Sequence, residues 1–395
     1  MTNDVDVLVV GGGVGGMAAA LAFARDPRIT VRVVERRAGP GNINRGDSLL
    51  PAVTRHLVRW GALERVMAAG ANPIDRMQVF HAEEGKLFEA PLTDPDGSPY
   101  VVLPHPDIER VLADAARATG RAHVSFRTSL RRLVEDGGRV RGAVVVDDAG
   151  RETEVRARLV VGADGSTSKV RDLLGVPFFS EPYDTGYYIV DLQRPEAYRD
   201  AMRLDLHADG GVMTMPQRDG VVGVAVLVLP RQLQLFQAGT MEQRLRAIWQ
   251  RSPLLAGMPH VGKNAHLYRL HRGHAARYLS RGAALMGDAV HLTNPTAGQG
   301  MTMAIEDAAA LARHVSPALH GSEPRLDAAL AAYEAERRPA NLELVRWSHW
   351  MGRFFAMSGP VADTVKRRVF AFGRTAVGQW VQREIWGHVA TRKAA

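Results

Sequence analysis

The 395-residue sequence predicts a mixed α/β fold in which an antiparallel sheet is inserted into a parallel-sheet framework. Three observations predict this fold class. The N-terminal residues follow the order strand, glycine cluster, helix, strand; the middle of the chain carries hairpin patterns; and the chain beyond Gly300 has a mostly helical pattern. Apolar residues make up 46% and charged residues 23%, which is ordinary for a globular protein and excludes a mainly disordered or fibrous chain.

The N-terminal segment predicts the start of a parallel sheet. Residues 6–10 form a short apolar run rich in β-branched side chains, typical of a buried strand, and residues 29–34 repeat this pattern. The alanine-rich residues 17–25 between them predict a helix, which gives the strand, helix, strand order of a parallel pair. Residues 49–69 follow with apolar side chains at helical spacing, and we expect a helix there.

The middle of the chain changes to the period of two that is typical of strands. Residues 131–161 predict an antiparallel meander. Further strands, separated by Asp-Gly dipeptides typical of hairpin turns, are expected at residues 187–190, 212–215 and 221–229. No long linker separates these strands from the α/β segments, so we expect interwoven domains rather than domains in series.

Composition excludes several classes of chemistry. The chain has no cysteine, which excludes disulfides, Cys-ligated zinc or iron–sulfur clusters and thiol nucleophiles. His271 and His274 have the spacing of a helical pair but no accompanying carboxylate motif, so we expect no metal site. The net charge of +8 is scattered, which argues against nucleic-acid binding. Neither a membrane span nor a signal peptide is evident, and we expect a cytoplasmic protein.

The glycine cluster is the first motif that carries chemistry. Gly11-Gly12-Gly13-Val14-Gly15-Gly16 satisfies G-x-G-x-x-G, follows a predicted strand and opens a predicted helix. Glu35 stands at the end of the next strand, 24 residues after Gly11, where a carboxylate can bind an adenosine ribose. Glycines at these positions let the backbone approach a pyrophosphate at the helix N-terminus. The context predicts a Rossmann-like dinucleotide site and leaves FAD and NAD both open.

Two further motifs select between these cofactors. The segment Gly162-Ala163-Asp164-Gly165 continues to Arg171 and resembles the GADGxxSxVR segment of flavin-dependent aromatic hydroxylases. Gly287-Asp288-Ala289-Val290-His291 continues to Gly300 and resembles their GDAAHxxPPxxGQG segment. With the glycine cluster, the motifs occur in the family's order and span residues 11–300. The chain thus resembles the single-component, group A FAD-dependent monooxygenases of the para-hydroxybenzoate hydroxylase type.

The resemblance implies a reaction and its partners. It implies non-covalent FAD, reduction by NADPH or NADH, and reaction with O2 through a flavin C4a-hydroperoxide. The substrate would be an electron-rich aromatic or heteroaromatic small molecule, hydroxylated in natural-product biosynthesis or aromatic catabolism. The implied division is an FAD-binding domain of residues 1–72, 101–172 and 265–316, a substrate-binding domain of 73–100 and 173–264, and a C-terminal helical region of 317–395.

The resemblance also implies site residues. Pro295 would shape the loop that positions the flavin oxygen adduct, Asp288 would accept a hydrogen bond from the ribityl chain, and the helix near Met301 would direct its N–H groups at the flavin ring. The expected cofactor-binding residues are Gly11, Gly13, Val14, Gly15, Gly16, Glu35, Arg36, Arg45, His105, Leu130, Asp164, Gly287, Asp288, Gly298, Gly300 and Met301.

Some positions depart from the family pattern. His105 stands where an Arg or Gln usually contacts the flavin side chain, and a histidine cannot match the two-pronged contact of a guanidinium. A helix-capping role for His105 is the alternative. Asn294 replaces the first of two loop prolines, and Thr302 replaces a frequent Asn. Arg45 falls where the family places an Arg near the pyrophosphate or the nicotinamide nucleotide, although a solvated surface Arg is an equal alternative.

Two other functions remain open on the sequence alone. The nucleotide motifs also fit an FAD-dependent dehydrogenase or reductase of a quinone or lipid-like substrate. A flavoprotein without enzymatic activity is the third possibility, because an apolar stripe of Val377, Trp380, Val381 and Ile385 has helical spacing that fits a partner or membrane surface. Packing of this stripe on the protein's own body is the favoured interpretation.

Overall fold

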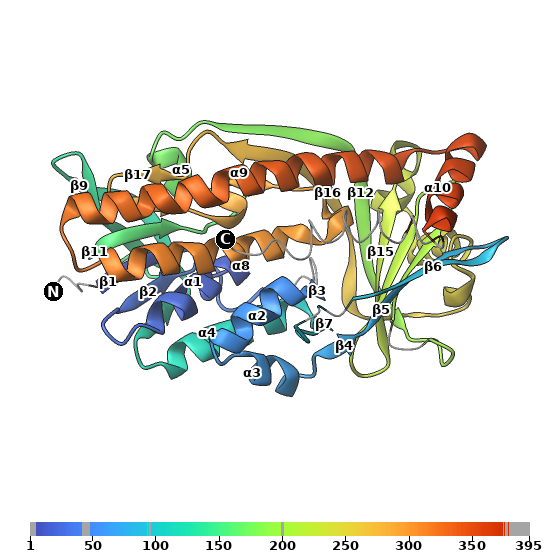
Figure 1. Ribbon diagram of the computed structural model, residues 1–395, viewed down its shortest axis with the longest axis horizontal. Coiled ribbons are helices and arrows are strands. Elements are labelled where there is room, and N and C mark those ends of the chain that lie inside the picture. Colours follow the sequence, from blue (N-terminus) through green and yellow to red (C-terminus); the bar gives the residue numbers. More distant parts are fainter. Residues whose placement is uncertain are drawn as a thin grey trace.

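A computed structural model describes residues 5–41, 48–92, 94, 96–198, 201–373, 375 and 378. Two eight-stranded sheets lie at opposite ends of an elongated molecule, and a long helix runs beside both of them (Figure 1). The predicted combination of a parallel sheet, an antiparallel sheet and C-terminal helices is confirmed.

The first sheet contains the N-terminal βαβ unit. Its strand order is β17-β18-β11-β1-β2-β8, and β1 pairs in parallel with both β2 and β11. These strands are β1 (Val5–Val10), β2 (Val31–Val34), β8 (Ala122–Ser125), β11 (Glu152–Gly162), β17 (Leu279–Ser280) and β18 (Ala283–Leu285). The predicted meander extends this first sheet: β9 (Thr128–Asp136) pairs antiparallel with β10 (Arg139–Asp147), and β10 pairs antiparallel with β11.

Helices pack closely around this sheet because their contact residues are small. Helix α1 (Val14–Ala24) is alanine-rich and buried along almost its whole length, between the sheet and the helices α4 (His105–Ala118) and α8 (Gln299–Val315). At the α1–α8 contact, a Cβ added to Gly15 would lie 3.2 Å from the Cβ of Ala304. Any larger residue at Gly15 would push these two helix N-terminal regions apart.

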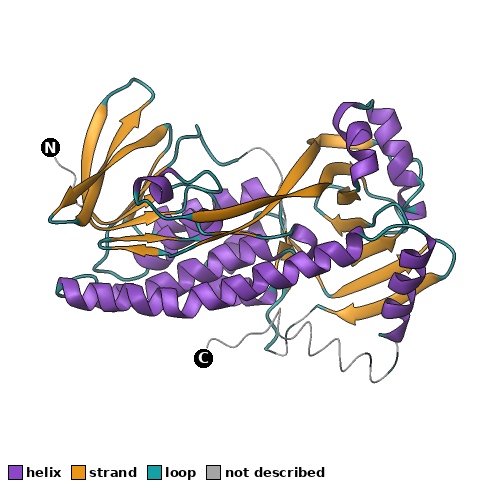
Figure 2. Ribbon diagram, turned by 90° about the horizontal axis from the view of Figure 1, so that it is seen from above, coloured by secondary structure: helices purple, strands orange, loops and turns teal. Residues whose placement is uncertain are grey.

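The second sheet is the predicted insertion. Its order is β19-β16-β12-β15-β14-β13-β5-β6, and it is antiparallel except for the β13–β5 pair. The strands are β5 (Arg76–His81), β6 (Gly85–Pro91), β12 (Phe178–Gln193), β13 (Met202–Leu206), β14 (Val212–Pro216), β15 (Val221–Val228), β16 (His260–Ala275) and β19 (His291–Leu292). Strand β12 is much longer than the strand predicted at residues 187–190, and β16 was not predicted; both reach toward the first sheet (Figure 2).

The two faces of the second sheet differ in environment. One face is covered by α6 (Leu233–Ala238) and α7 (Met241–Trp249), and its alternating residues, such as Tyr188, Val224 and Val226, form a closed apolar core with Phe236. The opposite face is only partly covered, with half-buried side chains along β12, β14 and β15. This alternation is the period-two pattern expected of a sheet with one closed face.

A three-stranded sheet lies between the two large sheets. It consists of β3 (Ser48–Leu49), β7 (Tyr100–Val102) and β4 (Asn72–Ile74), and it crosses the domain boundaries that we expected at 72/73 and 100/101. The domain division therefore stays a proposal. The single helix predicted over 49–69 is wrong, because Leu49 is in β3 and the rest forms α2 (Pro51–Arg59) and α3 (Leu63–Ala68), separated at Gly61 with φ of +67°.

The described C-terminal region is helical, as predicted. Helix α9 (Glu323–Ala356) extends over 34 residues alongside both sheets, and α10 (Pro360–Phe372) turns back against the end of the second sheet (Figure 2). The remaining α-helix of the described residues is the short α5 (Lys169–Leu173). The predicted stripe from Val377 to Ile385 lies outside the described residues. No helix in the described ranges is long and apolar enough to cross a membrane.

Candidate active site

The glycine loop between β1 and α1 requires glycine at specific positions. Gly11 has φ of +104°, and a Cβ added there would lie 2.3 Å from the carbonyl oxygen of Ala163. A Cβ on Gly16 would lie 1.9 Å from the Gly11 carbonyl oxygen. Gly13, by contrast, has open space: its nearest neighbour would be a Glu109 oxygen at 3.9 Å. Gly13 is also the N-cap of α1, and no side chain caps that end, so the first N–H groups can bind an anion.

Glu35 holds this loop in shape. It directly follows β2, is buried, and its Oε2 accepts a hydrogen bond from the Gly12 N–H at 2.6 Å. Its Oε1 accepts from the Arg37 N–H at 2.8 Å and from Arg37 Nε at 3.0 Å. The ribose contact that we expect from Glu35 stays a prediction, and Arg36 is exposed to solvent.

We expect Glu35→Ala to weaken FAD binding by about 1.5–3 kcal/mol, because it removes both the proposed ribose contact and the acceptor of the Gly12 N–H. Glu35→Gln should lose less, because its amide oxygen still accepts one hydrogen bond. Fluorescence titration of apoprotein with FAD measures both. Equal affinity in the two variants and the parent protein would show that Glu35 plays no part in the site.

Arg37 and Glu109 are site residues that the motif analysis missed. Arg37 donates to the Gly12 carbonyl at 3.2 Å and lies 3.1 Å from Glu109 Oε2, which also accepts from the Gly41 N–H at 2.7 Å. Burial of Glu109 would raise its pKa, but the hydrogen bonds from His105 and Gly41 and the charge of Arg37 bring the pKa below its usual value. A buried carboxylate thus lies beside the proposed pyrophosphate position, with Arg37 to offset its charge.

His105 belongs to the same cluster. It is the first residue of α4, does not cap that helix, and places Nε2 3.3 Å from Glu109 Oε1, one turn further along. The i, i+4 spacing of His105 and Glu109 is the signal from which the sequence could have paired them. A flavin contact by His105 stays a prediction. Arg45 lies outside the described residues.

The second motif forms a self-contained loop after β11. Asp164 Oδ1 accepts from Ser168 Oγ at 2.5 Å and Oδ2 accepts from the Val170 N–H at 3.1 Å. Ser168 in turn caps α5 by accepting from the Arg171 N–H at 3.0 Å. Burial raises the pKa of Asp164. The Leu130 carbonyl accepts from Lys169 Nζ at 3.0 Å, which ties β9 to this loop.

The third motif begins with a 3-10 turn, Gly287–Ala289, after β18. Gly287 has φ of +60°, and its N–H donates to Asp307 Oδ2 at 3.1 Å. Asp288 is exposed, whereas Gly287 and Ala289 on either side of it are buried. The turn therefore presents the Asp288 carboxylate outward from a fixed backbone.

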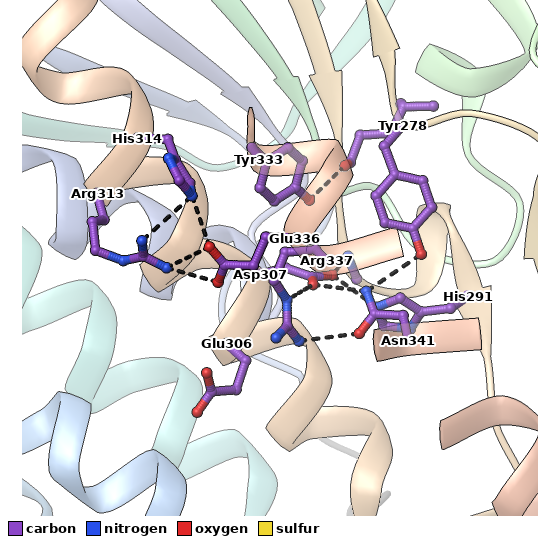
Figure 3. A network of polar contacts seen from close by, with 12 residues as sticks. Tyr278, His291, Glu306, Asp307, Arg313, His314, Tyr333, Glu336, Arg337 and Asn341 are labelled. Carbon is purple, nitrogen blue, oxygen red and sulfur yellow. Dashed lines mark hydrogen bonds and ion pairs between the residues drawn. The ribbon is translucent and has the colours of Figure 1, made fainter. Parts of the chain in front are cut away.

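Asp307 of α8 anchors that turn from within the protein (Figure 3). It is fully buried; its Oδ1 accepts from Arg337 Nε and from Asn341 Nδ2, both at 2.8 Å, and its Oδ2 lies 2.7 Å from His291 Nε2. Burial alone would raise its pKa, but the charges of His291 and Arg337 bring the pKa well below its usual range. Gly287 and His291 stand in the third motif, but no local motif indicates the whole network, because its other members come from two separate segments.

His274 extends this network toward the second sheet. Its Nε2 lies 2.9 Å from the hydroxyl of Tyr278, and that hydroxyl also accepts from Asn341 Nδ2 at 3.3 Å. Burial, reinforced by the nearby His291, lowers the pKa of His274 to about 4.

This lowered pKa predicts a pH dependence of stability. Because the unfolded histidine binds its proton near pH 6.5, its contribution is complete above that pH and is lost as the pH falls toward 4. Between pH 7.5 and 5, His274 should account for about 1 kcal/mol of lost unfolding free energy, because solvent around this partly exposed ring screens part of the effect. Urea unfolding of the parent protein and His274→Gln at both pH values measures this. An unchanged pH dependence in the variant would contradict the prediction.

The Pro295 loop is fixed against both α9 and the second sheet. A 3-10 turn, Pro295–Ala297, is capped by Asn294, whose Oδ1 accepts from the Thr296 N–H at 3.0 Å. Thr296 Oγ1 lies 3.0 Å from the Tyr187 hydroxyl, and burial raises the pKa of Tyr187 to about 12. The Asn294 side chain also packs against Gly352 of α9, where an added Cβ would lie 2.3 Å from Asn294 Nδ2.

The N-terminus of α8 follows this loop and leaves polar groups without partners. Gly298, with φ of +65°, is its N-cap, no side chain caps it, and its first turn, which includes Gly300 and Met301, contains no acidic residue. Gln299 is 1% exposed, and neither its amide oxygen nor its nitrogen has a hydrogen-bond partner; the Thr302 hydroxyl is likewise buried and unpartnered. Such groups beside a helix N-terminus indicate a bound polar ligand.

These features fit FAD. The uncapped N-termini of α1 and α8 meet through Gly15 and Ala304, so one molecule can lie across both. The N-terminus of α1 suits an anion, and the N-terminus of α8 suits an electron-rich ring edge. Among the described residues, no group of three or more His, Cys, Asp or Glu side chains is placed to hold a metal.

The partly covered face of the second sheet completes the site. Tyr187 on β12 reaches Thr296, and Met215 on β14 accepts a hydrogen bond at Sδ from Ser48 Oγ at 3.3 Å. Apolar residues of the three-stranded sheet, including Ile74 and Tyr100, pack near Met215. The antiparallel sheet therefore supplies a wall between the Pro295 loop and the three-stranded sheet.

Known proteins are similar to this chain in sequence. A family model described as an FAD binding domain matches residues 4–348. The chain is 29% identical to 6-methylpretetramide 4-monooxygenase of Streptomyces rimosus over 96% of this chain and 91% of that protein. It is 30% identical to the rifampicin monooxygenase of Streptomyces venezuelae over 86% of this chain and 69% of that protein.

Solved structures show the same fold. The chain is similar to PqsL of Pseudomonas aeruginosa in complex with 2-aminobenzoylacetate, with a TM-score of 0.78 at 26% identity over 93% of this chain and 99% of that one. Its TM-score is 0.85 to p-nitrophenol 4-monooxygenase of Pseudomonas putida, at 21% identity and with 100% of both chains covered.

Proposed function

This chain belongs to the FAD-binding family of flavin-dependent monooxygenases, and on that premise we propose that it hydroxylates an electron-rich aromatic or heteroaromatic small molecule. The reductant would be NADPH or NADH, and the oxygen atom would come from O2. The observation that carries the proposal is the contact between Tyr187 and Thr296, which joins the loop at the α8 N-terminus to an apolar sheet face. The names of the Streptomyces relatives support a small organic substrate, in natural-product biosynthesis or in aromatic catabolism.

We assign the cofactor-binding roles as follows. The α1 N-terminus from Gly13 to Gly16 holds the pyrophosphate, Glu35 holds the adenosine ribose, and Asp288 accepts from the ribityl chain. The first turn of α8, with Gly300 and Met301, directs its N–H groups at the flavin ring. Arg36, Arg45, His105, Leu130 and Asp164 remain expected neighbours of the cofactor or of its loops.

Bound FAD supplies redox chemistry that no side chain here can perform, by taking electrons from NAD(P)H and delivering them to O2. The protein orients the substrate and excludes water. Pro295 restricts the backbone of the loop, and Asn294 and Tyr187 hold that loop in place. Because burial raises the pKa of Tyr187 to about 12, its hydroxyl stays protonated at neutral pH and can donate or accept a hydrogen bond there.

The purified protein tests this proposal. We expect a yellow protein with one FAD per chain, and NAD(P)H oxidation that speeds up with at least one member of a panel of phenols and hydroxylated heteroaromatics. A protein that cannot be reconstituted with FAD would refute the proposal. Conversion of the substrate that proceeds equally well without oxygen would indicate a dehydrogenase instead.

Asp288→Ala tests the cofactor site separately. We expect 10- to 100-fold weaker FAD binding, which corresponds to the loss of about 1.5–3 kcal/mol from one charged hydrogen-bond acceptor. The exposed side chain packs little, so the midpoint of apoprotein unfolding should stay unchanged. Asp136→Ala, at the exposed last residue of β9, is the control. Unchanged FAD affinity in Asp288→Ala would remove this residue from the site.

A further inference from the structure

The partly covered face of the second sheet has an unusual composition. Strand registers place Leu204, Met213, Ala225 and Ile189 in one row across β13, β14, β15 and β12. The adjacent row on the same face runs from Met215 through Gly223 to Asp191. Residues directly opposite each other in antiparallel strands share a face, so these two rows form one surface.

The side chains at the centre of this surface are short, which leaves a low strip along β15. Strand β15 contributes only Gly223 and Ala225 there, whereas its neighbours contribute the longer Met213 and Met215 on one side and Ile189 on the other. Neighbouring strands lie about 4.8 Å apart, so the strip between the flanking side chains is about 10 Å across, and it extends about 7 Å along β15. These dimensions suit a flat system of fused rings better than a single ring. Thioether sulfurs also make favourable contacts with aromatic rings.

Among the described residues, the two rows contain no Lys or Arg, and a histidine, His266 on β16, stands opposite Ile189 at their edge. Tyr187 and Leu227 in the next row are not Lys or Arg either. Arg203 on β13 belongs to the opposite face, where its guanidinium lies 3.6 Å from the ring centroid of Phe80 and is paired with Asp205. The only ionisable acid in the two rows is Asp191, whose Oδ2 accepts from Asn264 Nδ2 at 2.5 Å.

We infer that the face formed by Met213, Met215, Gly223, Ala225 and Ile189 selects an uncharged, fused-ring aromatic substrate and discriminates against aromatic carboxylates. The inference rests on the proposed function and goes beyond it in naming the substrate class. A carboxylate over the low strip would lose its hydration without gaining a Lys or Arg partner from the two rows, and it would approach the Asp191 carboxylate. A neutral ring system loses little hydration and covers the apolar side chains of this face.

Two probes that differ only in one carboxylate test the inference: 2-naphthol and 3-hydroxy-2-naphthoate. Each is titrated into the FAD-loaded enzyme, and the Kd is read from the perturbation of the flavin absorbance, with the NAD(P)H oxidation rate as a second readout. We expect 2-naphthol to bind at least tenfold more tightly than 3-hydroxy-2-naphthoate, and more tightly than phenol. Equal or tighter binding of the carboxylate, or binding of neither naphthalene probe by an FAD-loaded enzyme, would overturn the inference.

Two variants locate the selectivity on this face. Met215→Arg should reverse the preference toward 3-hydroxy-2-naphthoate, because it supplies the missing cation. Ala225→Leu should weaken 2-naphthol binding at least tenfold by raising the low strip, with FAD content unchanged, whereas the exposed Ala256→Leu should change neither. Unaltered 2-naphthol binding in Ala225→Leu would contradict the inference even if Met215→Arg did not fold. If the parent protein does not bind FAD, the proposed function is refuted instead.

Discussion

Replacement of Asp307 by alanine is expected to lower the free energy of unfolding by about 3–5 kcal/mol, the range for removal of one partner from a buried ion pair. The Asp307 carboxylate is fully buried and accepts from Arg337, Asn341 and the Gly287 N–H, with His291 beside it. Its removal leaves the buried Arg337 guanidinium without its counter-charge. It also releases the turn that presents Asp288, so FAD affinity should fall as well.

Urea unfolding of the apoprotein measures the stability change, and FAD titration measures the second effect. Asp307→Asn keeps the volume and one acceptor oxygen, and should fall between the parent and the alanine variant. Asp172→Ala, whose side chain is 71% exposed, is the control and should change stability little. A loss below 1 kcal/mol in Asp307→Ala would show that the network contributes little to stability.

Replacement of Gly11 by alanine is expected to weaken FAD binding at least 100-fold. The new Cβ would lie 2.3 Å from the Ala163 carbonyl oxygen, and φ of +104° is unfavourable for any residue with a side chain. Both conflicts involve backbone, so β1 or the loop after β11 must move. That movement would displace the N–H groups at the start of α1. We expect a stability loss of about 2–4 kcal/mol in addition.

Gly150→Ala separates the effect of the positive φ from the effect of the close backbone contact. Gly150 also has positive φ, +77°, but a Cβ there would meet nothing within 4 Å. It should lose about 1 kcal/mol of stability and retain full FAD affinity. Equal FAD affinity in Gly11→Ala and the parent protein would contradict the proposed role of the glycine loop.

The parallel sheet and the antiparallel insertion could be predicted because their signals are local. The apolar runs around the glycine cluster and the Asp-Gly turns each occupy a few consecutive residues. The break between α2 and α3 at Gly61 was missed because apolar spacing continues across it. The length of α9 was not predictable from local preference, because Pro339 lies inside the helix, where packing along both sheets outweighs the lost hydrogen bond.

The site divides in the same way. The glycine loop, Asp164 and Asp288 stand in local motifs, and the structure places their loops at strand ends around α1 and α8. The contact between Arg37 and Glu109 and the partners of Asp307 were missed because they join residues far apart in sequence, whereas the i, i+4 pair of His105 and Glu109 could have been recognised locally. Asp307, for example, binds Gly287, 20 residues before it, and Arg337, 30 residues after it. Such pairs become visible only when the fold brings the segments together.

The central claim is that this chain transfers one oxygen atom from O2 to an aromatic substrate. The most direct test is to incubate the FAD-loaded enzyme with NAD(P)H and the most stimulating aromatic of the panel under isotopically labelled oxygen gas, and in a parallel reaction in labelled water. We predict that the hydroxylated product carries one labelled oxygen atom from the gas and none from water. Product labelled from water, or formed equally well without oxygen, would contradict the claim.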